Sequence, residues 1–232
     1  MNYYYHPKPE SNFVLNSEES SHAIKVLRKT QGDQIHLMDG NGYSYLAEIT
    51  NDNFRKCSFK ILSKRKHEKK SFSIHVAIAP TKNIDRIEWF VEKVCELGID
   101  EISLIETKRT ERTKVKIERL EKKAISAMKQ SKNFWKCKIN AVQKFNSFLQ
   151  SKPASTQNFI AFVETGKEES LKKMVTASEK YLVLIGPEGD FTLEEIQHAK
   201  THGFETINLG NNVLRTETAG IIAVHTLNLM NE

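Results

Sequence analysis

Leu184-Ile-Gly-Pro-Glu-Gly-Asp-Phe191 and Leu209-Gly-Asn-Asn-Val-Leu-Arg-Thr-Glu-Thr-Ala-Gly220 are the two stretches that decide the fold of this chain, and they are named here the first loop and the second loop. Each follows a short apolar run and leads into residues with helical spacing. Glycines at such strand-to-helix turns let a ligand approach the main chain closely, and open α/β sheets bind ligands beyond the carboxyl ends of their strands. Two turns of this kind predict one shared pocket.

Alternating apolar strands and helical stripes extend outward from these loops through residues 71–232. Strands are expected at 73–79, 102–105, 138–142, 159–163, 181–185 and 205–209, and helices at 84–97 and 113–132. Gly98 follows the first of these helices, where glycine is favoured. The alternation predicts an α/β domain with a mainly parallel sheet that is covered on both faces.

Residues 1–70 have a different pattern, typical of a small β-rich module. Strands are predicted at 34–38, 43–49 and near 57–62, with the turn Asp39-Gly-Asn-Gly42 between the first two and a short helix over 18–27. The run Lys64-Arg-Lys-His-Glu-Lys-Lys70 has no apolar residue and breaks both patterns. We therefore predict a domain boundary there, which gives domains 1–70 and 71–232.

Composition limits the class of protein without selecting a function. With 232 residues, 39% of them hydrophobic, the chain can bury a substantial core. No apolar run approaches the length of a membrane span and the start lacks the pattern of a secretion signal, so we expect a cytoplasmic protein with no membrane partner. The three cysteines are far apart and the eight histidines lack a recognised ligand spacing, so no metal is expected.

Positive charge is concentrated in one central stretch. Residues 108–144 contain 13 Lys and Arg but only 3 Asp and Glu, whereas the net charge of the whole chain is +6. A polyanion such as RNA would be attracted to this stretch. A solvated helix face rich in lysine gives the same composition, so charge alone does not separate the two interpretations.

The motifs of this chain, taken together and in their order, resemble those of a known family, although no single short motif would be sufficient. Both loops closely resemble the signature of the SPOUT methyltransferases, and specifically of the RsmE family, which methylates N3 of one uridine in 16S ribosomal RNA with S-adenosylmethionine. Eight further segments are similar to that family: His22-Ala-Ile-Lys-Val-Leu-Arg28, Gly32-Asp33, Met38-Asp-Gly40, Lys82, Asp85-Arg86, Glu96-Leu-Gly98, Thr107-Lys-Arg109 and Gln130-Ser131. The resemblance implies a SPOUT-type domain with a trefoil knot, a PUA-like RNA-binding domain at 1–70, and a homodimer that acts on 16S rRNA or the small ribosomal subunit.

The resemblance also implies S-adenosylmethionine as the cofactor and both loops as its binding site. The residues expected to contact it are Leu184, Ile185, Gly186, Glu188, Gly189, Leu209, Gly210, Val213, Leu214, Thr218 and Ala219. Glu188 is expected near the sulfonium; alternatively, it complements the positive end of the following helix, which Thr192 and Glu195 open with a capping-box pattern. The apolar pair Val213-Leu214 is expected to face the adenine.

Arg215 and Glu217 are the residues assigned to catalysis. The directed donors of the Arg215 guanidinium suit a phosphate or the uracil carbonyls. The site must also stabilise the anion formed when the uridine N3 proton leaves, or accept that proton. The alternative for Glu217 is that it complements the dipole of the last helix while Thr216 caps it. The sequence leaves the proton acceptor open.

RNA contact is expected from basic residues that lie in family-like stretches or in the central basic region. They are Arg28, Lys82, Arg86, Arg109, Arg112, Lys129 and Lys132. Some positions depart from the family pattern: Asp190 stands where the family often has glycine, and Asn211-Asn212 where it often has proline or a basic residue. Lys132 is expected to replace a family arginine.

Three functions fit these observations. The leading interpretation is methyl transfer from S-adenosylmethionine to N3 of a uridine in 16S rRNA. The second keeps the fold and cofactor but changes the RNA or the methylated atom. The third is an RNA-binding ribosome assembly factor without methyl transfer, and absence of S-adenosylmethionine binding would favour it.

Overall fold

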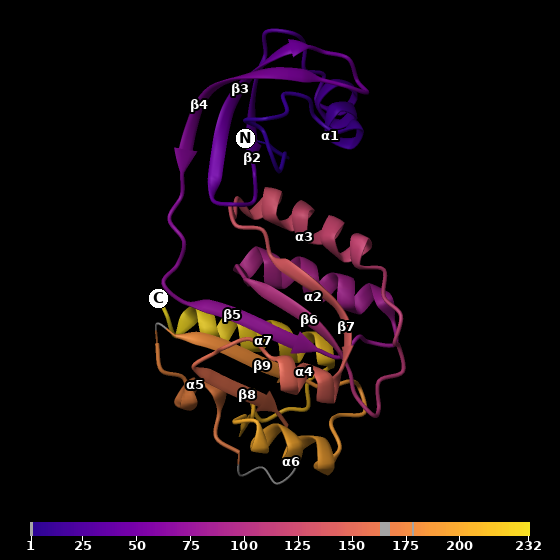
Figure 1. Ribbon diagram of the computed structural model, residues 1–232, viewed down its shortest axis with the longest axis vertical. Coiled ribbons are helices and arrows are strands. Elements are labelled where there is room, and N and C mark those ends of the chain that lie inside the picture. Colours follow the sequence, from indigo (N-terminus) through magenta and orange to yellow (C-terminus); the bar gives the residue numbers. More distant parts are fainter. Residues whose placement is uncertain (1, 163–167, 178) are drawn as a thin grey trace. The chain divides into compact units, whose positions relative to one another are not determined.

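The computed structural model describes residues 2–162, 168–177 and 179–232, and the chain divides into two compact units. The N-terminal unit comprises Met1–Lys69 and Ile125–Lys136, and the C-terminal unit comprises Lys70–Ala124 and Cys137–Glu232. Each unit contains its own β-sheet (Figure 1). The N-terminal unit therefore takes a second segment from far along the sequence, which no sequence pattern indicates.

The N-terminal unit is built on a four-stranded sheet of order β1-β2-β3-β4. Its elements are β1 (Tyr3–Tyr5), α1 (Ser17–Ser21), the π-helix η1 (His22–Val26), β2 (Gln34–Met38), β3 (Tyr43–Asn51) and β4 (Ser58–Lys66). β1 runs parallel to β2, and the other pairs are antiparallel. Ile35 and Leu37 alternate with the more exposed Gln34 and His36, and they belong to the core on one side of the sheet.

Two elements of this unit differ from expectation. β1 is not predicted, because three successive tyrosines show no alternation; its middle residue, Tyr4, is 1% exposed. β4 continues to Lys66, through residues that were expected to break the pattern. An edge strand tolerates such residues, since the stems of long basic side chains cover apolar surface: the Lys64 ammonium lies 4.1 Å from the Tyr43 ring centre.

The second segment of the N-terminal unit packs on the turn between β2 and β3. Gly42 N donates to the Phe134 carbonyl at 2.9 Å, and Lys136 N donates to the Gly40 carbonyl at 2.8 Å. Gly42 has a φ of +89°, and a Cβ there would overlap the ring of Trp135. The glycine therefore serves both the backbone turn and the close approach of the tryptophan.

The C-terminal unit is an α/β fold around a six-stranded, wholly parallel sheet of order β10-β8-β9-β5-β6-β7, which confirms the predicted class. Its strands are β5 (Ser73–Ile78), β6 (Glu101–Glu106), β7 (Lys138–Lys144), β8 (Gln157–Ala161), β9 (Lys180–Ile185) and β10 (Glu205–Ile207). Its helices are α2 (Ile84–Leu97), the first part of α3 (Ile117–Ser131), α4 (Phe145–Ser151), α5 (Leu171–Met174), α6 (Leu193–Thr201) and α7 (Thr216–Leu229). The strand expected at 159–163 ends at Ala161, and residue 163 lies outside the described residues.

Helices cover both faces of this sheet, and the sequence of β5 shows why both of its faces can be buried. Ala77 belongs to a buried cluster with α4 and α6, whereas the next residue, Ile78, lies near Gly220 of α7 on the opposite face. Successive strand residues point to opposite faces, so a strand buried on both sides is mainly apolar. α7 contacts the sheet and α2 (Figure 1), which explains why its apolar positions exceed one stripe. The trefoil knot and the dimer stay predictions.

Caps fix where two helices begin and end. Asn83 caps α2 by accepting from Asp85 N at 2.9 Å, and Gly98 ends it in the left-handed conformation with a φ of +90°. The predicted capping box at the start of α6 is present: Thr192 Oγ1 accepts from Glu195 N, and Glu195 Oε2 accepts from Thr192 N. No helix among the described residues is long and apolar enough to cross a membrane.

A buried polar network lies on β5, β6 and β7. His75, which is 8% exposed, places Nε2 2.9 Å from Ser103 Oγ, and Asn140 Nδ2 donates to the same hydroxyl at 2.9 Å. Burial lowers the pKa of His75 to about 4, while Glu101 acts to raise it and Lys138 to lower it. His75 is therefore neutral near pH 7.

Candidate active site

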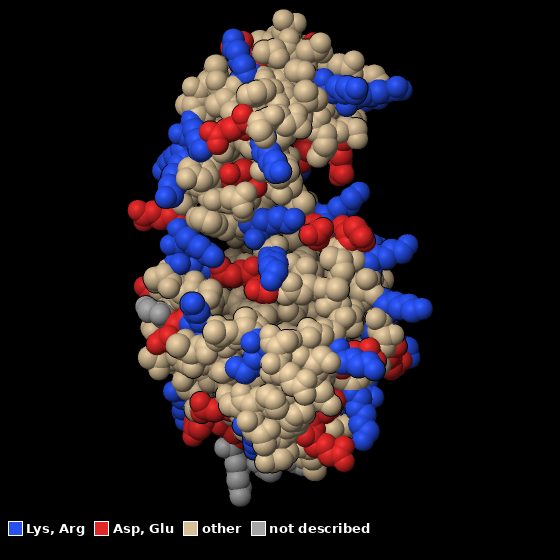
Figure 2. All heavy atoms as spheres, viewed as in Figure 1, with Lys and Arg blue, Asp and Glu red and all other residues tan. Residues whose placement is uncertain are grey.

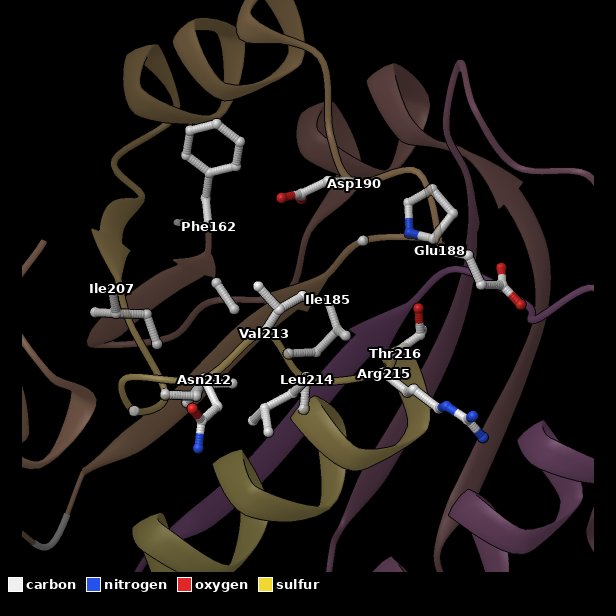
Figure 3. Close-up of a pocket in the computed structure, with 16 residues that line it drawn as sticks. Phe162, Ile185, Glu188, Asp190, Ile207, Asn212, Val213, Leu214, Arg215 and Thr216 are labelled. Carbon is white, nitrogen blue, oxygen red and sulfur yellow. The ribbon is translucent and has the colours of Figure 1, made fainter. Parts of the chain in front are cut away.

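One cavity of about 320 Å³ lies where β8, β9 and β10 end and α7 begins (Figure 3). Both glycine-bearing loops contribute to it, as the sequence predicts. Its lining residues are Ala161, Phe162, Ile185, Gly186, Pro187, Glu188, Asp190, Ile207, Leu209, Gly210, Asn212, Val213, Leu214, Arg215, Thr216 and Ala219. The carboxyl ends of parallel strands meet at one edge of a sheet, which is why two loops whose glycines Gly186 and Gly210 are 24 residues apart share a pocket.

The first loop is a tight turn in which little room is left for a side chain at Gly186. A Cβ there would lie 3.1 Å from Asp190 Oδ1 and 3.1 Å from the Phe191 ring. Asp190 N donates to the Pro187 carbonyl at 2.9 Å and closes the turn. Gly186 and Pro187 are buried, whereas Glu188 and Gly189 at the tip of the turn are exposed.

Apolar side chains form one side of the cavity. Phe162 and Ile207 come from the ends of the adjacent strands β8 and β10, and Val213 and Leu214 come from the second loop (Figure 3). Val213 is 98% exposed, which is unusual for an isolated valine. The sequence motifs do not reveal Phe162 or Ile207, because their place here depends on the order of strands in the sheet. The pairing of Ile207 with Ala161 brings them to the site.

Glu188 lines the cavity but is turned away from its apolar side. Its Oε1 accepts a hydrogen bond from Lys82 N at 3.0 Å, and Figure 3 shows its carboxylate directed away from Phe162 and Ile207. The side chain thus links the first loop to the loop after β5. This contact fixes its orientation without a ligand.

Two arginines from the loop after β6 hold the neighbouring loops. Arg109 Nη1 donates to the Gly189 carbonyl at 2.6 Å. Arg112 donates to the Lys82 carbonyl through Nη2 at 2.6 Å and Nε at 3.0 Å. These residues were expected to contact RNA, which stays a prediction; in the structure one N–H donor of Arg109 and two of Arg112 point at backbone carbonyls beside the cavity, out of the five N–H donors that each guanidinium has.

The two residues assigned to catalysis lie in different surroundings. Arg215 is exposed, lines the cavity and extends its guanidinium away from Phe162 (Figure 3). Glu217 does not line the cavity; it is 5% exposed, with Oε1 3.8 Å from Arg86 Nε. Its Oε2 has no hydrogen-bond partner among the described residues.

Most of the residues expected to bind cofactor meet at this cavity. Eight of them line it: Ile185, Gly186, Glu188, Leu209, Gly210, Val213, Leu214 and Ala219. Leu184 is fully buried in the sheet core, and Gly189 and Thr218 are not among the lining residues. Leu184 follows the strand alternation, so its side chain points to α4 and α6.

Three of the seven basic residues expected at RNA, Lys82, Arg86 and Lys129, form ion pairs. Lys82 pairs with Glu111 at 2.9 Å, and Lys129 pairs with the buried Glu19 at 2.6 Å. Arg28 and Lys132 are exposed and pair with no acidic side chain that the structure describes. On the face drawn in Figure 2, basic and acidic side chains are interspersed.

No cluster of three His, Cys, Asp or Glu that could hold a metal ion occurs within 2–162, 168–177 and 179–232. The lining of the cavity consists of apolar side chains, backbone groups of the two loops, the carboxylates of Glu188 and Asp190, and the guanidinium of Arg215. This set suits a flat organic ligand with polar and charged ends.

Comparison with known proteins agrees with this geometry. Residues 67–228 match a family model described as RNA methyltransferase domain, and residues 15–62 match one described as RNA methyltransferase PUA domain. The chain is 25% identical over 233 residues to the ribosomal RNA small subunit methyltransferase E of Bacillus subtilis, which covers 95% of this chain and 91% of that protein. The chain belongs to the RsmE family of RNA methyltransferases.

Two solved structures resemble this RsmE family member over the whole chain. A probable rRNA-methyltransferase from Porphyromonas gingivalis is 34% identical, with a TM-score of 0.93, and covers 100% of this chain and 98% of that one. A putative methyltransferase from Legionella pneumophila, in complex with the bound cofactor SAM, is 26% identical, with a TM-score of 0.89 and the same coverage. The RsmE fold, with a PUA module before the methyltransferase domain, is thus confirmed for this chain.

Proposed function

We propose that this chain transfers a methyl group from S-adenosylmethionine to N3 of a uridine in the 16S rRNA of the small ribosomal subunit. The observation that carries the proposal is the single cavity formed by both glycine-bearing loops at the carboxyl ends of β8, β9 and β10. Family membership supports the same reaction, because the relative from Bacillus subtilis is a ribosomal RNA small subunit methyltransferase.

The lining of the cavity fits S-adenosylmethionine in both shape and chemistry. Its apolar side, with Phe162, Ile207 and Leu214, suits the adenine, and the exposed Val213 would be covered by it. A Cβ at Gly210 would meet nothing within 4 Å, so the main chain there faces open space. When bound, the cofactor supplies a reactive methyl group on a sulfonium.

The residues of the chain would then bind the uridine and stabilise its charge. We assign Arg215 to the uracil carbonyls or the adjacent phosphate, because its guanidinium is exposed at the cavity. A cation there stabilises the anion left when the N3 proton departs. We assign Glu217 a positioning role: its ion pair with Arg86 ties the start of α7, which follows Arg215, to α2. In-line transfer between two held partners needs little further help.

The finer assignments follow from the same proposal. We place rRNA contact on Arg28 and Lys132, whose side chains are exposed, and keep 1–70 as the PUA-like domain and 71–232 as the SPOUT domain. We also propose a homodimer, a trefoil knot formed by the last segment, and a cytoplasmic location, where ribosomal subunits are assembled. The exposed Trp89 of α2 and Leu229 of α7 give the C-terminal unit apolar surface for a second copy.

Mass-spectrometric mapping of rRNA from cells with and without the gene tests the function. Loss of one N3-methyluridine on deletion is expected, with restoration by the intact protein but not by Arg215→Ala. Lys200→Ala, which removes an exposed cation on α6 away from the cavity, is the matched control and should restore the modification. An unchanged 16S rRNA after deletion would reject the proposed substrate, and a fully active Arg215→Ala would reject the role of Arg215.

A further inference from the structure

Asp190 is the acid whose carboxylate is directed into the cavity. Figure 3 shows its oxygens on the side that faces Phe162, opposite in direction to those of Glu188. Oδ1 accepts a hydrogen bond from Phe191 N at 2.7 Å. Oδ2 accepts no hydrogen bond from the part of the chain that the structure describes, and the carboxylate forms no ion pair there.

Two features make this position less favourable for an aspartate than for a glycine. Its φ is +61°, in the left-handed region that glycine occupies freely and that aspartate and asparagine adopt at a smaller cost than other residues. Burial also raises the pKa of the carboxyl group, and the charge of Arg109 only partly offsets that effect. A half-buried carboxylate without an ionic partner becomes more favourable when a cation enters beside it.

The neighbouring acid cannot serve the same purpose in the observed arrangement. Glu188 is exposed, and its carboxylate is held by Lys82 N on the far side of the loop. Asp190 and Glu188 are the two acidic residues among those that line the cavity. The remaining lining near Asp190 is the apolar group of Phe162, Ile185 and Val213.

We propose that Asp190 binds a positively charged group of S-adenosylmethionine and so selects the methyl donor by charge. S-adenosylmethionine carries two such groups, the sulfonium and the α-ammonium. The inference rests on the proposed function and adds Asp190 as a cofactor-binding residue, which the sequence motifs do not assign. It also transfers to Asp190 the role that the sequence suggests for Glu188.

Calorimetric titration of purified variants with three ligands tests this inference without measuring methyl transfer. The ligands are S-adenosylmethionine, S-adenosylhomocysteine, which lacks the sulfonium, and methylthioadenosine, which lacks both cationic groups. Asp190→Asn and Asp190→Gly suit the test because both residues tolerate the left-handed conformation, so their unfolding temperatures should equal or exceed that of the wild type. Glu205→Gln, at an exposed acid in β10, controls for the loss of one negative charge.

The expected result is an affinity for S-adenosylmethionine about tenfold lower in both Asp190 variants and unchanged in Glu205→Gln, as for loss of a charge-assisted contact. An equal loss for S-adenosylhomocysteine identifies the ammonium as the bound group; no loss for it identifies the sulfonium. Methylthioadenosine should bind all variants alike.

Wild-type affinity for S-adenosylmethionine in both Asp190 variants would overturn the inference while leaving the proposed function intact, and so would an equal loss for methylthioadenosine. Failure of the wild-type protein to bind S-adenosylmethionine, with or without RNA, would overturn both.

Discussion

Gly220→Ala should destabilise the C-terminal unit, although alanine is the better helix former. An added Cβ would lie 3.0 Å from Phe90 Cδ2, closer still to Cε2, and 3.3 Å from Ile78 Cδ1. Both neighbours are fully buried, so the ring has no solvent-exposed space to move into. Forcing a methyl group into a packed core costs about 1–3 kcal/mol, and the closeness of Phe90 Cε2 places this case in the upper part of that range, at about 2–3 kcal/mol; glycine to alanine in a helix interior gains about 1 kcal/mol.

The net change should lower the free energy of unfolding by about 1–2 kcal/mol, which corresponds to a Tm decrease of about 2–8 °C for a chain of this length. Thermal unfolding followed by circular dichroism measures it. Phe90→Leu supplies the matched background, because it removes the ring edge that the new methyl group would strike. In that background Gly220→Ala should be neutral or stabilising, since only the helix-propensity gain remains. An equal loss in both backgrounds, or a higher Tm for Gly220→Ala alone, would refute the steric reasoning.

Four other predictions follow from contacts described above. The folded-state pKa of His75, about 4, lies below the ordinary value of 6.5, so as the pH falls the unfolded chain binds the proton first. The free energy of unfolding should therefore decrease by on the order of 2–3 kcal/mol as the pH is lowered from about 6.5 to 4. His75→Gln should make the plot of unfolding free energy against pH flatter in this range, and parallel plots for the two proteins would contradict the reasoning. Arg112→Lys should weaken S-adenosylmethionine binding several-fold in calorimetry, because lysine cannot reproduce the paired hydrogen bonds to the Lys82 carbonyl. An unchanged affinity would show that these hydrogen bonds do not position the loop for cofactor binding. Lys132→Asn, which suits the φ of +57°, should reduce the slope of log affinity for rRNA against log salt by about one without changing cofactor affinity, and an unaltered slope would remove Lys132 from the interface. Val213→Ser should reduce cofactor affinity about tenfold if the adenine covers this exposed side chain, and equal binding would place the adenine elsewhere.

Local signals predict most of the fold of the C-terminal unit. A strand buried on both faces is mainly apolar, so the segments around Ile78 and Ile185 are easy to find. Gly98 and the Thr192 capping box mark helix ends because their chemistry acts within a few residues. β1 and the end of β4 lack such signals, since their pairing depends on strands far along the chain.

In the candidate site, too, local sequence signals predict some features, whereas others depend on contacts between distant parts of the chain. Glycine-bearing turns identify the loops, because close approach of a ligand to the main chain needs them in any fold. Phe162 and Ile207 reach the cavity through the order of β8 and β10, which no local pattern encodes. The orientations of Glu188 and Arg112 depend on single hydrogen bonds to a loop after another strand. Residue type therefore indicated which side chains carry charge near the site, but not which of them face the ligand.

The insertion of Trp135 against Gly42 has a consequence for synthesis of the protein. When the first 69 residues leave the ribosomal exit tunnel, residues 125–136, which pack on the turn between β2 and β3, have not yet been translated. The β-module should therefore stay open to proteases until residue 136 emerges. Gene fragments that end near residue 70 should express as insoluble or loosely folded polypeptides, and fusion of the module to another protein would have to carry residues 125–136 with it.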